Sequence, residues 1–233
     1  MFVHSAICGP MQANCHIVAA DQGRACVIID PGMSAAPFID RVIKDHHLTP
    51  AGILLTHGHT DHVADVAPVA DRYAIPAWIR SEDRPFITDP VAGLGPELGK
   101  LVAAVLRRKL DEPKRLELLD DRNVLQLADL TFQVAHAPGH TPGSVMYVLD
   151  QRDNGDTLED ASLVFTGDVL FAGSIGRTDL PGGDPHVLAS TLRGPVADLE
   201  AAAVIRPGHG QASTMAVERA HNPYLRAEFL QKW

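Results

Sequence analysis

The stretch THGHTDH, residues 56–62, places three histidines and one aspartate within six positions. It follows a short apolar run whose composition predicts a buried strand. In an extended chain, residues two apart point the same way, so His57 and His59 can face one point beyond the strand end. Asp61 and His62 then fall at the start of a helical pattern and can face a second point nearby. This spacing predicts ligands for two adjacent metal ions.

Further ligands are expected downstream, because two neighbouring cations repel each other unless an anionic group lies between them. Three residues qualify: His140 in APGHTPGS, Asp168 in FTGDVLF and His209 in RPGHG. Each follows a glycine, which lets the backbone turn sharply and approach an ion closely. Taken singly, each is more typical of a turn residue bonded to backbone. Together with residues 57–62 they predict a metal site.

The chemistry of this donor set restricts the metal. Five imidazoles and two carboxylates suit zinc, iron or manganese, whereas calcium and magnesium prefer shells made of oxygen alone. We therefore expect two divalent ions, with zinc favoured and iron or manganese also compatible.

Short apolar runs rich in β-branched residues alternate with helical patterns along the chain, which predicts a layered α/β architecture. The expected strands lie in residues 25–32, 51–59, 75–80, 144–150, 162–168 and 202–210, and the expected helices in 34–47, 61–74 and 184–200. The strands Ile53–Thr56, Leu163–Thr166 and Val204–Arg206 each run directly into a loop that carries candidate ligands. Such ligands are expected to converge at one edge of a sheet.

The segment 81–117 is typical of a helical insertion. Its helix carries Leu98, Leu101, Val102, Val105 and Leu106 on one face. Two interpretations stay open, a packing helix and a lid over the site.

The composition favours one soluble domain over residues 1–233. The net charge of −9 has no basic concentration beyond Arg107-Arg108-Lys109, which argues against nucleic acid as a partner. No signal-like leader and no membrane-length apolar run is present, so we expect a cytoplasmic protein without membrane contact. The three cysteines lack CxxC spacing and are expected to be core residues. The oligomeric state stays open.

The motifs THGHTDH, PGHTPGS, TGDVLF and PGHG resemble those of the metallo-β-lactamase-fold hydrolases over nearly the whole chain. NCHIVAA, VIIDPG and GSIGRTDLPGGD are most similar to short bacterial glyoxalase II-type, hydroxyacylglutathione hydrolase-like enzymes. The resemblance implies a four-layer αβ/βα sandwich with a dinuclear site at one edge. It implies a first metal on His57, His59 and His140, a second on Asp61, His62 and His209, and Asp168 as the bridge.

The resemblance also suggests contacts to substrate. A basic residue after the bridging aspartate faces the substrate in these enzymes, and Arg177 occupies that position here; a salt bridge with Asp179 or Asp184 is the equal alternative. Asn14 is the second candidate, although the related enzymes often have Asn-Cys-Tyr where this chain has Asn14-Cys15-His16. Longer enzymes grip glutathione with a C-terminal helical segment, and only 24 residues follow His209, so the carrier thiol and acyl group stay open.

The implied activity is hydrolysis of a hydroxyacyl thioester to a hydroxy acid and a thiol by metal-bound hydroxide, with Asp61 and Asp168 as catalytic residues. No G-x-S-x-G nucleophile motif is present, which agrees with a water nucleophile. The alternative is a persulfide dioxygenase of the same fold, which holds one iron through the positions of His57, His140 and Asp168. A non-catalytic module that keeps the fold is the third interpretation.

Overall fold

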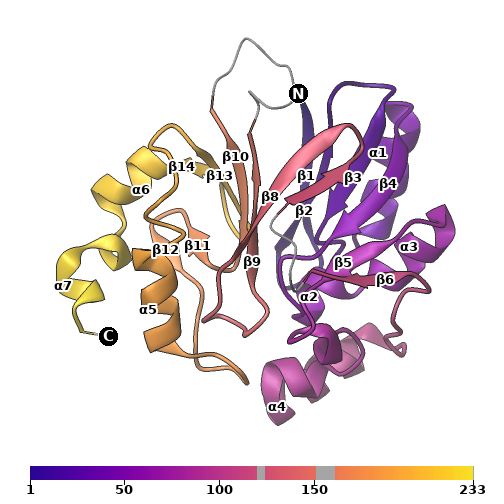
Figure 1. Cartoon of the computed structure of the whole chain (residues 1–233). Helices are drawn as coiled ribbons and strands as arrows, with labels where there is room; N and C mark the ends of the chain where they lie inside the picture. Colours follow the sequence, from indigo (N-terminus) through magenta and orange to yellow (C-terminus); the bar gives the residue numbers. More distant parts are fainter. Residues whose placement is uncertain (120–123, 151–160, 233) are drawn as a thin grey trace.

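The computed structural model describes residues 1–119, 124–150 and 161–232. Two six-stranded sheets face each other, with helices on their outer faces (Figure 1). This is the four-layer αβ/βα sandwich that the resemblance implied. No helix in the described ranges is both long enough and apolar enough to cross a membrane.

The first sheet has the order β1-β2-β3-β4-β5-β6. Its strands are β1 (Phe2–Cys8), β2 (Ala13–Ala19), β3 (Ala25–Ile29), β4 (Thr49–Leu54), β5 (Ala77–Ile79) and β6 (Leu116–Leu118). The first three pair antiparallel, and β3 to β6 pair parallel. Every residue of β2 is buried, which fits a strand covered on both faces.

The second sheet has the order β14-β13-β10-β9-β8-β7. Its strands are β7 (Val124–Leu127), β8 (Leu130–His136), β9 (Val145–Leu149), β10 (Leu163–Gly167), β13 (Val204–Pro207) and β14 (Ser213–Thr214). Only β10 and β13 pair parallel. A small hairpin of β11 (Leu170–Phe171) and β12 (Ser174–Ile175) follows β10.

Three apolar clusters hold these layers together. The cluster between the sheets includes Val27 and Leu54 from the first sheet and Phe132, Tyr147 and Phe165 from the second. The outer face of the first sheet packs against α1 (Ala36–Asp45) and α3 (Val66–Tyr73). The outer face of the second sheet packs against α5 (Pro185–Arg193), α6 (Met215–His221) and α7 (Ala227–Leu230).

The parallel pairs position the site, because the carboxyl ends of parallel neighbours meet at one edge. In the first sheet, Ile29 pairs with Leu54, so the loops after β3 and β4 start side by side. In the second, Gly167 pairs with Pro207, so the loops after β10 and β13 also start together. The Val145 amide donates to the Thr56 carbonyl at 2.8 Å and joins the two sheets at this edge.

Two helical segments differ from expectation. Residues 61–74 form two helices, α2 (Thr60–Val63) and α3, rather than one. Within 81–117, a 3₁₀ turn η1 (Arg84–Ile87) precedes α4 (Pro90–Leu106), which is kinked where Gly95 has φ 78° and precedes Pro96. Val102 is buried as expected, but Leu101 and Val105 of the same predicted face are exposed.

Candidate metal centre

The loop after β4 and the first turn of α2 carry four of the seven candidate ligands. His57 lies in the loop after β4, His59 precedes α2 with φ −64° and ψ 142°, and Asp61 and His62 lie in the first turn of α2. All four side chains are buried. The short helix therefore turns the second pair of side chains toward the first, as the spacing predicted.

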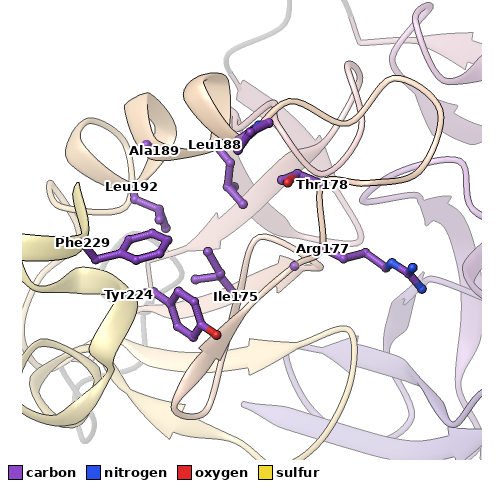
Figure 2. Close-up of a pocket in the computed structure, with 10 residues that line it drawn as sticks. Ile175, Arg177, Thr178, Leu188, Ala189, Leu192, Tyr224 and Phe229 are labelled. Atoms are coloured by element: carbon purple, nitrogen blue, oxygen red, sulfur yellow. The ribbon is translucent and has the colours of Figure 1, made fainter. Parts of the chain in front are cut away.

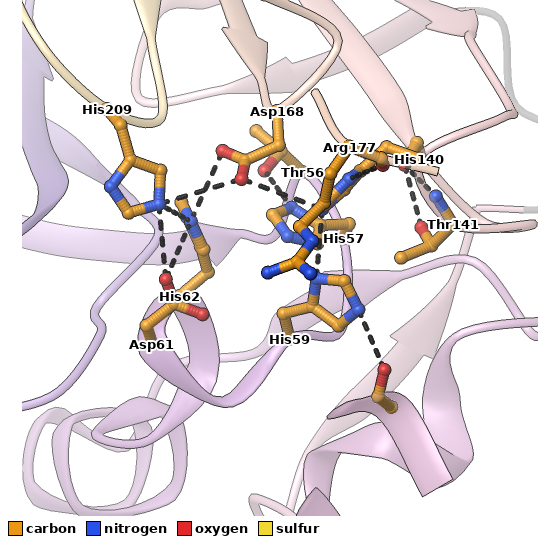
Figure 3. A network of polar contacts seen from close by, with 12 residues as sticks. Thr56, His57, His59, Asp61, His62, His140, Thr141, Asp168, Arg177 and His209 are labelled. Carbon is orange, nitrogen blue, oxygen red and sulfur yellow. Dashed lines mark hydrogen bonds and ion pairs between the residues drawn. The ribbon is translucent and has the colours of Figure 1, made fainter. Parts of the chain in front are cut away.

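The remaining candidates reach the same place from the second sheet. Asp168 follows β10 and His209 follows β13, while His140 lies in the loop between β8 and β9. Figure 3 shows all seven side chains around one centre. The structure thus brings together all seven residues that the sequence predicts as metal ligands.

The spacing of the inward-facing atoms defines two groups. His59 Nδ1 and His140 Nε2 lie 2.9 Å apart, and His57 belongs to the same group. His62 Nε2 lies 3.2 Å from His209 Nε2, and Asp61 belongs to that second group.

Asp168 lies between the groups. Its Oδ1 is 3.4 Å from His62 Nε2, and its Oδ2 is 3.6 Å from both His140 Nε2 and His209 Nε2. A carboxylate in this position can contact an ion in either group.

The outward-facing nitrogen of each histidine is already bonded to oxygen. Three of these nitrogens donate to backbone carbonyls: His59 Nε2 to Gly93, His140 Nδ1 to Arg177 and His209 Nδ1 to Gln12. His62 Nδ1 donates to the Asp30 carboxylate, and His57 Nδ1 contacts Thr56 Oγ1. All five distances lie between 2.7 and 3.1 Å. The Thr56 hydroxyl donates its own proton to Asp30, so it accepts from His57. These contacts place the imidazole proton on the outward nitrogen, as carbonyl and carboxylate partners do for metal-binding histidines.

In the first group, it follows that the inward nitrogens of His59 and His140 present lone pairs to one another. Two such nitrogens at 2.9 Å repel unless a positive charge lies between them. Among the described residues, His57 Nε2 and Asp168 Oδ1 are buried and have no hydrogen-bond partner, which is costly without a ligand. The donor set therefore fits metal cations.

Burial lowers the pKa of His57 well below its ordinary value, and neighbouring imidazoles lower it further. Burial, reinforced by His140, lowers the pKa of His59 to about 3. Both rings are therefore neutral near pH 7 and offer lone pairs.

The second group attracts positive charge. Burial alone would lower the pKa of His62, but Asp61, Asp168 and Asp30 outweigh it and raise the pKa to about 10. Burial likewise opposes protonation of His209, yet Asp61 and Asp168 raise its pKa. The carboxylates thus favour a cation at this point.

Two buried aspartates that support the cluster were not predicted. Asp30 accepts from the Thr56 amide and hydroxyl as well as from His62, so both of its oxygens are used. It lies near His57 and His62 in a third possible metal group, but these bonds favour an orienting role. Asp83 accepts from the Gly58 and Gly143 amides and the Thr141 hydroxyl, which joins the loops carrying His59 and His140.

The candidate substrate contacts behave differently from each other. Arg177 forms a bidentate pair with Asp179, both distances being 2.7 Å, which is the salt-bridge interpretation; it also lines the cavity over the cluster, and its contact with substrate stays a prediction. The Asn14 amide donates to the Pro207 and Gly210 carbonyls at 2.9 Å. Asn14 thereby holds the loop of His209, and this geometry gives no support to a substrate contact.

His16, where related enzymes often have tyrosine, is a core residue. Its Nδ1 lies 2.7 Å from the Ser5 hydroxyl and its ring packs against Phe165. Burial lowers its pKa to about 4, so it is neutral near pH 7. The three cysteines are buried and free, as expected for core residues.

A cavity of about 310 Å³ opens over the cluster. Besides the candidate ligands, its wall is formed by Met11, Leu94, Leu98, Phe171, Ile175, Arg177 and Leu180. A second cavity of about 330 Å³ adjoins it at Ile175 and Arg177 and is bounded by α5 and the aromatic pair Tyr224 and Phe229 (Figure 2).

The chain resembles known proteins over nearly its full length. The model of the Metallo-beta-lactamase superfamily matches residues 8–209. The chain is 32% identical to the hydroxyacylglutathione hydrolase GloC of Haemophilus influenzae, over 93% of this chain and 94% of that protein.

Two crystal structures share the fold at 32% identity. The B3 metallo-beta-lactamase BLEG-1 superposes with a TM-score of 0.81 and covers 97% of this chain and 100% of its own. TTHA1623 in a di-iron-bound form superposes with a TM-score of 0.73 and covers 95% of this chain and 99% of its own.

Proposed function

Because the chain belongs to the metallo-beta-lactamase superfamily and gathers five inward-facing imidazoles around Asp168, we propose that it is a dinuclear metal-dependent hydrolase of hydroxyacyl thioesters. The observation that carries this proposal is the arrangement of lone pairs in the first group, where the outward nitrogens of His59 and His140 are bonded to oxygen and their inward nitrogens face each other.

The two groups of ligand atoms suggest which residues would hold which ion. One ion would be held by His57, His59 and His140, the other by Asp61, His62 and His209, with Asp168 contacting both. Zinc is favoured by the donor set, and iron or manganese is compatible with it. When bound, the ions supply a deprotonated water at neutral pH and stabilise the oxyanion that forms on the acyl carbonyl.

The chain's own residues position the reactants. Asp61, which lies 3.1 Å from His209 Nε2, has a carboxylate that can also accept a hydrogen bond from the attacking water and orient it. Water oxygen bonds to the acyl carbon, the carbon–sulfur bond breaks, and the sulfur departs as a thiolate, which takes up in solvent the proton that the water gave up. Arg177, which lines the cavity, would face the departing part of the substrate.

The thioester is favoured over an amide or lactam by the cavity wall. Of the described residues that line it, every titratable side chain except Arg177 belongs to the cluster, so none is left to protonate an amine leaving group. A thiolate leaves without such assistance. The similarity to GloC, named a hydroxyacylglutathione hydrolase, also supports a thioester substrate.

The direct test is turnover of S-lactoyl thioesters of several cellular thiols by metal-loaded protein, followed with a thiol-reactive dye. We expect hydrolysis by the wild type. Asp168→Ala should lose both activity and bound metal, because the residue contacts both ligand groups. Asp198→Ala removes an exposed carboxylate elsewhere and should change neither.

Three results would contradict the proposal. Full activity of Asp168→Ala would refute the bridging role. Cleavage of a chromogenic β-lactam, with no cleavage of any thioester, would indicate a β-lactamase instead. One iron per chain with sulfite formed from a thiol persulfide would assign dioxygenase chemistry.

A further inference from the structure

The outer side of α4 carries an apolar groove. Leu101 is 61% exposed and Val105 is 53% exposed, which is unusual for large apolar side chains on a helix. The groove has a volume of about 180 Å³ and only apolar residues line it: Pro10, Met11, Met33, Leu98, Leu101, Val102 and Val105. It offers hydrocarbon contacts and no side-chain hydrogen bonds.

The groove adjoins the cavity over the cluster. Met11 and Leu98 line both spaces. Met33 and Val102, at the bottom of the groove, belong to the same packed cluster as Leu94, which lines the cavity. An apolar chain in the groove would therefore lie beside the cavity, and only the side chains of Met11 and Leu98 would lie between it and the candidate metal ligands.

The opposite side of the cavity has a different character. There Arg177 lines both this cavity and the adjoining second cavity, which Thr178 and Tyr224 also line. Figure 2 shows the Arg177 side chain extending away from the aromatic residues of that space. Polar groups of Arg177, Thr178 and Tyr224 are thus available on this side beside apolar residues such as Leu188, Leu192 and Phe229, whereas the α4 side offers apolar surface alone.

A thioester has two arms that match these two sides. Cellular carrier thiols are polar, and burying their polar groups in an apolar groove without partners would cost free energy. We propose that the α4 groove binds the hydrocarbon chain of the acyl group and that the carrier thiol leaves on the Arg177 side. The proposal rests on the function proposed above and extends its substrate class to medium-chain acyl thioesters.

Binding of the product acids tests the groove without turnover. Acetate, butyrate, hexanoate and octanoate are titrated into the metal-loaded protein by calorimetry. We expect Kd to fall by up to about fourfold per methylene, which corresponds to about 0.8 kcal/mol for each buried CH₂. A Kd that does not depend on chain length would overturn the proposal.

Variants locate the effect. Leu101→Glu and Val105→Glu place a charge in the groove at exposed positions and should flatten the dependence of Kd on chain length. Val217→Glu makes the same change at another exposed apolar residue, 49% exposed on α6, and should leave it intact. If Kd depends on chain length in the same way in all three variants, the α4 groove is not the binding site of the acyl chain.

Turnover separates this inference from the proposed function. With S-acyl N-acetylcysteamine thioesters, we expect the ratio of kcat/KM for octanoyl to acetyl substrate to be well above one in the wild type and to fall in Leu101→Glu. Cleavage without chain-length dependence would refute the groove and leave the hydrolase. Chain-length-dependent acid binding without cleavage would retain the groove and refute the thioesterase.

A second copy of the chain is the competing occupant. Light scattering distinguishes it, because Leu101→Glu would then convert a dimer into a monomer. A dimer with a flat chain-length profile would overturn the proposal, whereas a wild type and variant of equal mass support it.

Discussion

At the residue scale, the outward ring nitrogen of each histidine in the cluster matters as much for metal binding as the inward one. A carbonyl or carboxylate on the outer side fixes the tautomer and the ring orientation before any ion arrives. Asp30 does this for His62 at 3.0 Å, and it also holds the Thr56 hydroxyl that contacts His57. One aspartate therefore orients a ring in each ligand group.

Asp30→Asn should therefore weaken metal binding. The substitution keeps the size of the side chain but removes the charge that accepts from His62. We expect metal affinity to fall by roughly 10- to 100-fold, as for other residues that orient metal ligands. Competition against a chromophoric chelator measures this change.

Asp83→Asn is the matched control. Asp83 is equally buried and accepts from two backbone amides, yet it bonds to no candidate ligand in the described contacts. We expect it to lower stability, measured by thermal unfolding, with a smaller effect on metal affinity. An Asp30→Asn protein that binds metal as tightly as the wild type would refute the orienting role.

The sequence predicted the ligands better than their supports. His57, His59, Asp61 and His62 are recognisable because four metal-binding residue types fall in one short loop. Asp30 also ends a strand, but a single aspartate before Pro-Gly is typical of an ordinary turn. The Gly93 carbonyl that accepts from His59 left no signal, because a backbone group has no residue type.

At the scale of elements, parallel pairing explains why ligands distant in sequence meet. The ends of β3 and β4 adjoin, and so do those of β10 and β13. The sequence indicated the strands and the residues after them, but most pairings of the second sheet are antiparallel, which alternating strand and helix patterns did not predict.

The insertion shows where periodicity fails. A helical wheel places Leu101, Val102 and Val105 on one apolar face. In the structure only part of that face is buried, because Val102 packs inward while Leu101 and Val105 are exposed. The kink at Gly95 contributes, because the first turn of α4 contacts His59 through Gly93 while the rest of the helix packs on Met33. The Gly95-Pro96 pair was the sequence signal for this kink, because proline disfavours helical backbone at the residue before it, and periodicity alone does not use that signal.

Gly95→Ala should disturb this element. The backbone at φ 78° and ψ 169° is a region that only glycine adopts readily, so alanine costs about 1–3 kcal/mol of stability. An added Cβ would meet nothing closer than 3.8 Å, so backbone strain is the sole source. Relief of that strain would move Gly93 away from His59, and we expect weaker metal binding in the chelator competition.

Gly23→Ala provides the comparison. Gly23 also has a positive φ, 71°, in a turn with open space around its Cβ, and it lies far along the chain from α4. It should lower the unfolding temperature without changing metal affinity. If both variants retain wild-type metal affinity, α4 does not support the site.

At the scale of the whole molecule, the candidate centre lies where the two sheets meet. The loop after β4 belongs to the first sheet, whereas His140, Asp168 and His209 belong to the second. Hydrogen bonds already join the two sheets. The Tyr147 hydroxyl donates to the Leu55 carbonyl, and the backbone amide of Asn14 donates to the Gly208 carbonyl. Bound ions would add a further link between the sheets.

The central claim is that seven side chains from both sheets hold two metal ions. Elemental analysis of the protein after loading with zinc, iron or manganese and removal of free metal tests it most directly. We predict close to two ions per chain with at least one of these metals, and a clear loss in Asp168→Ala. One ion or none per chain with all three metals would contradict the claim.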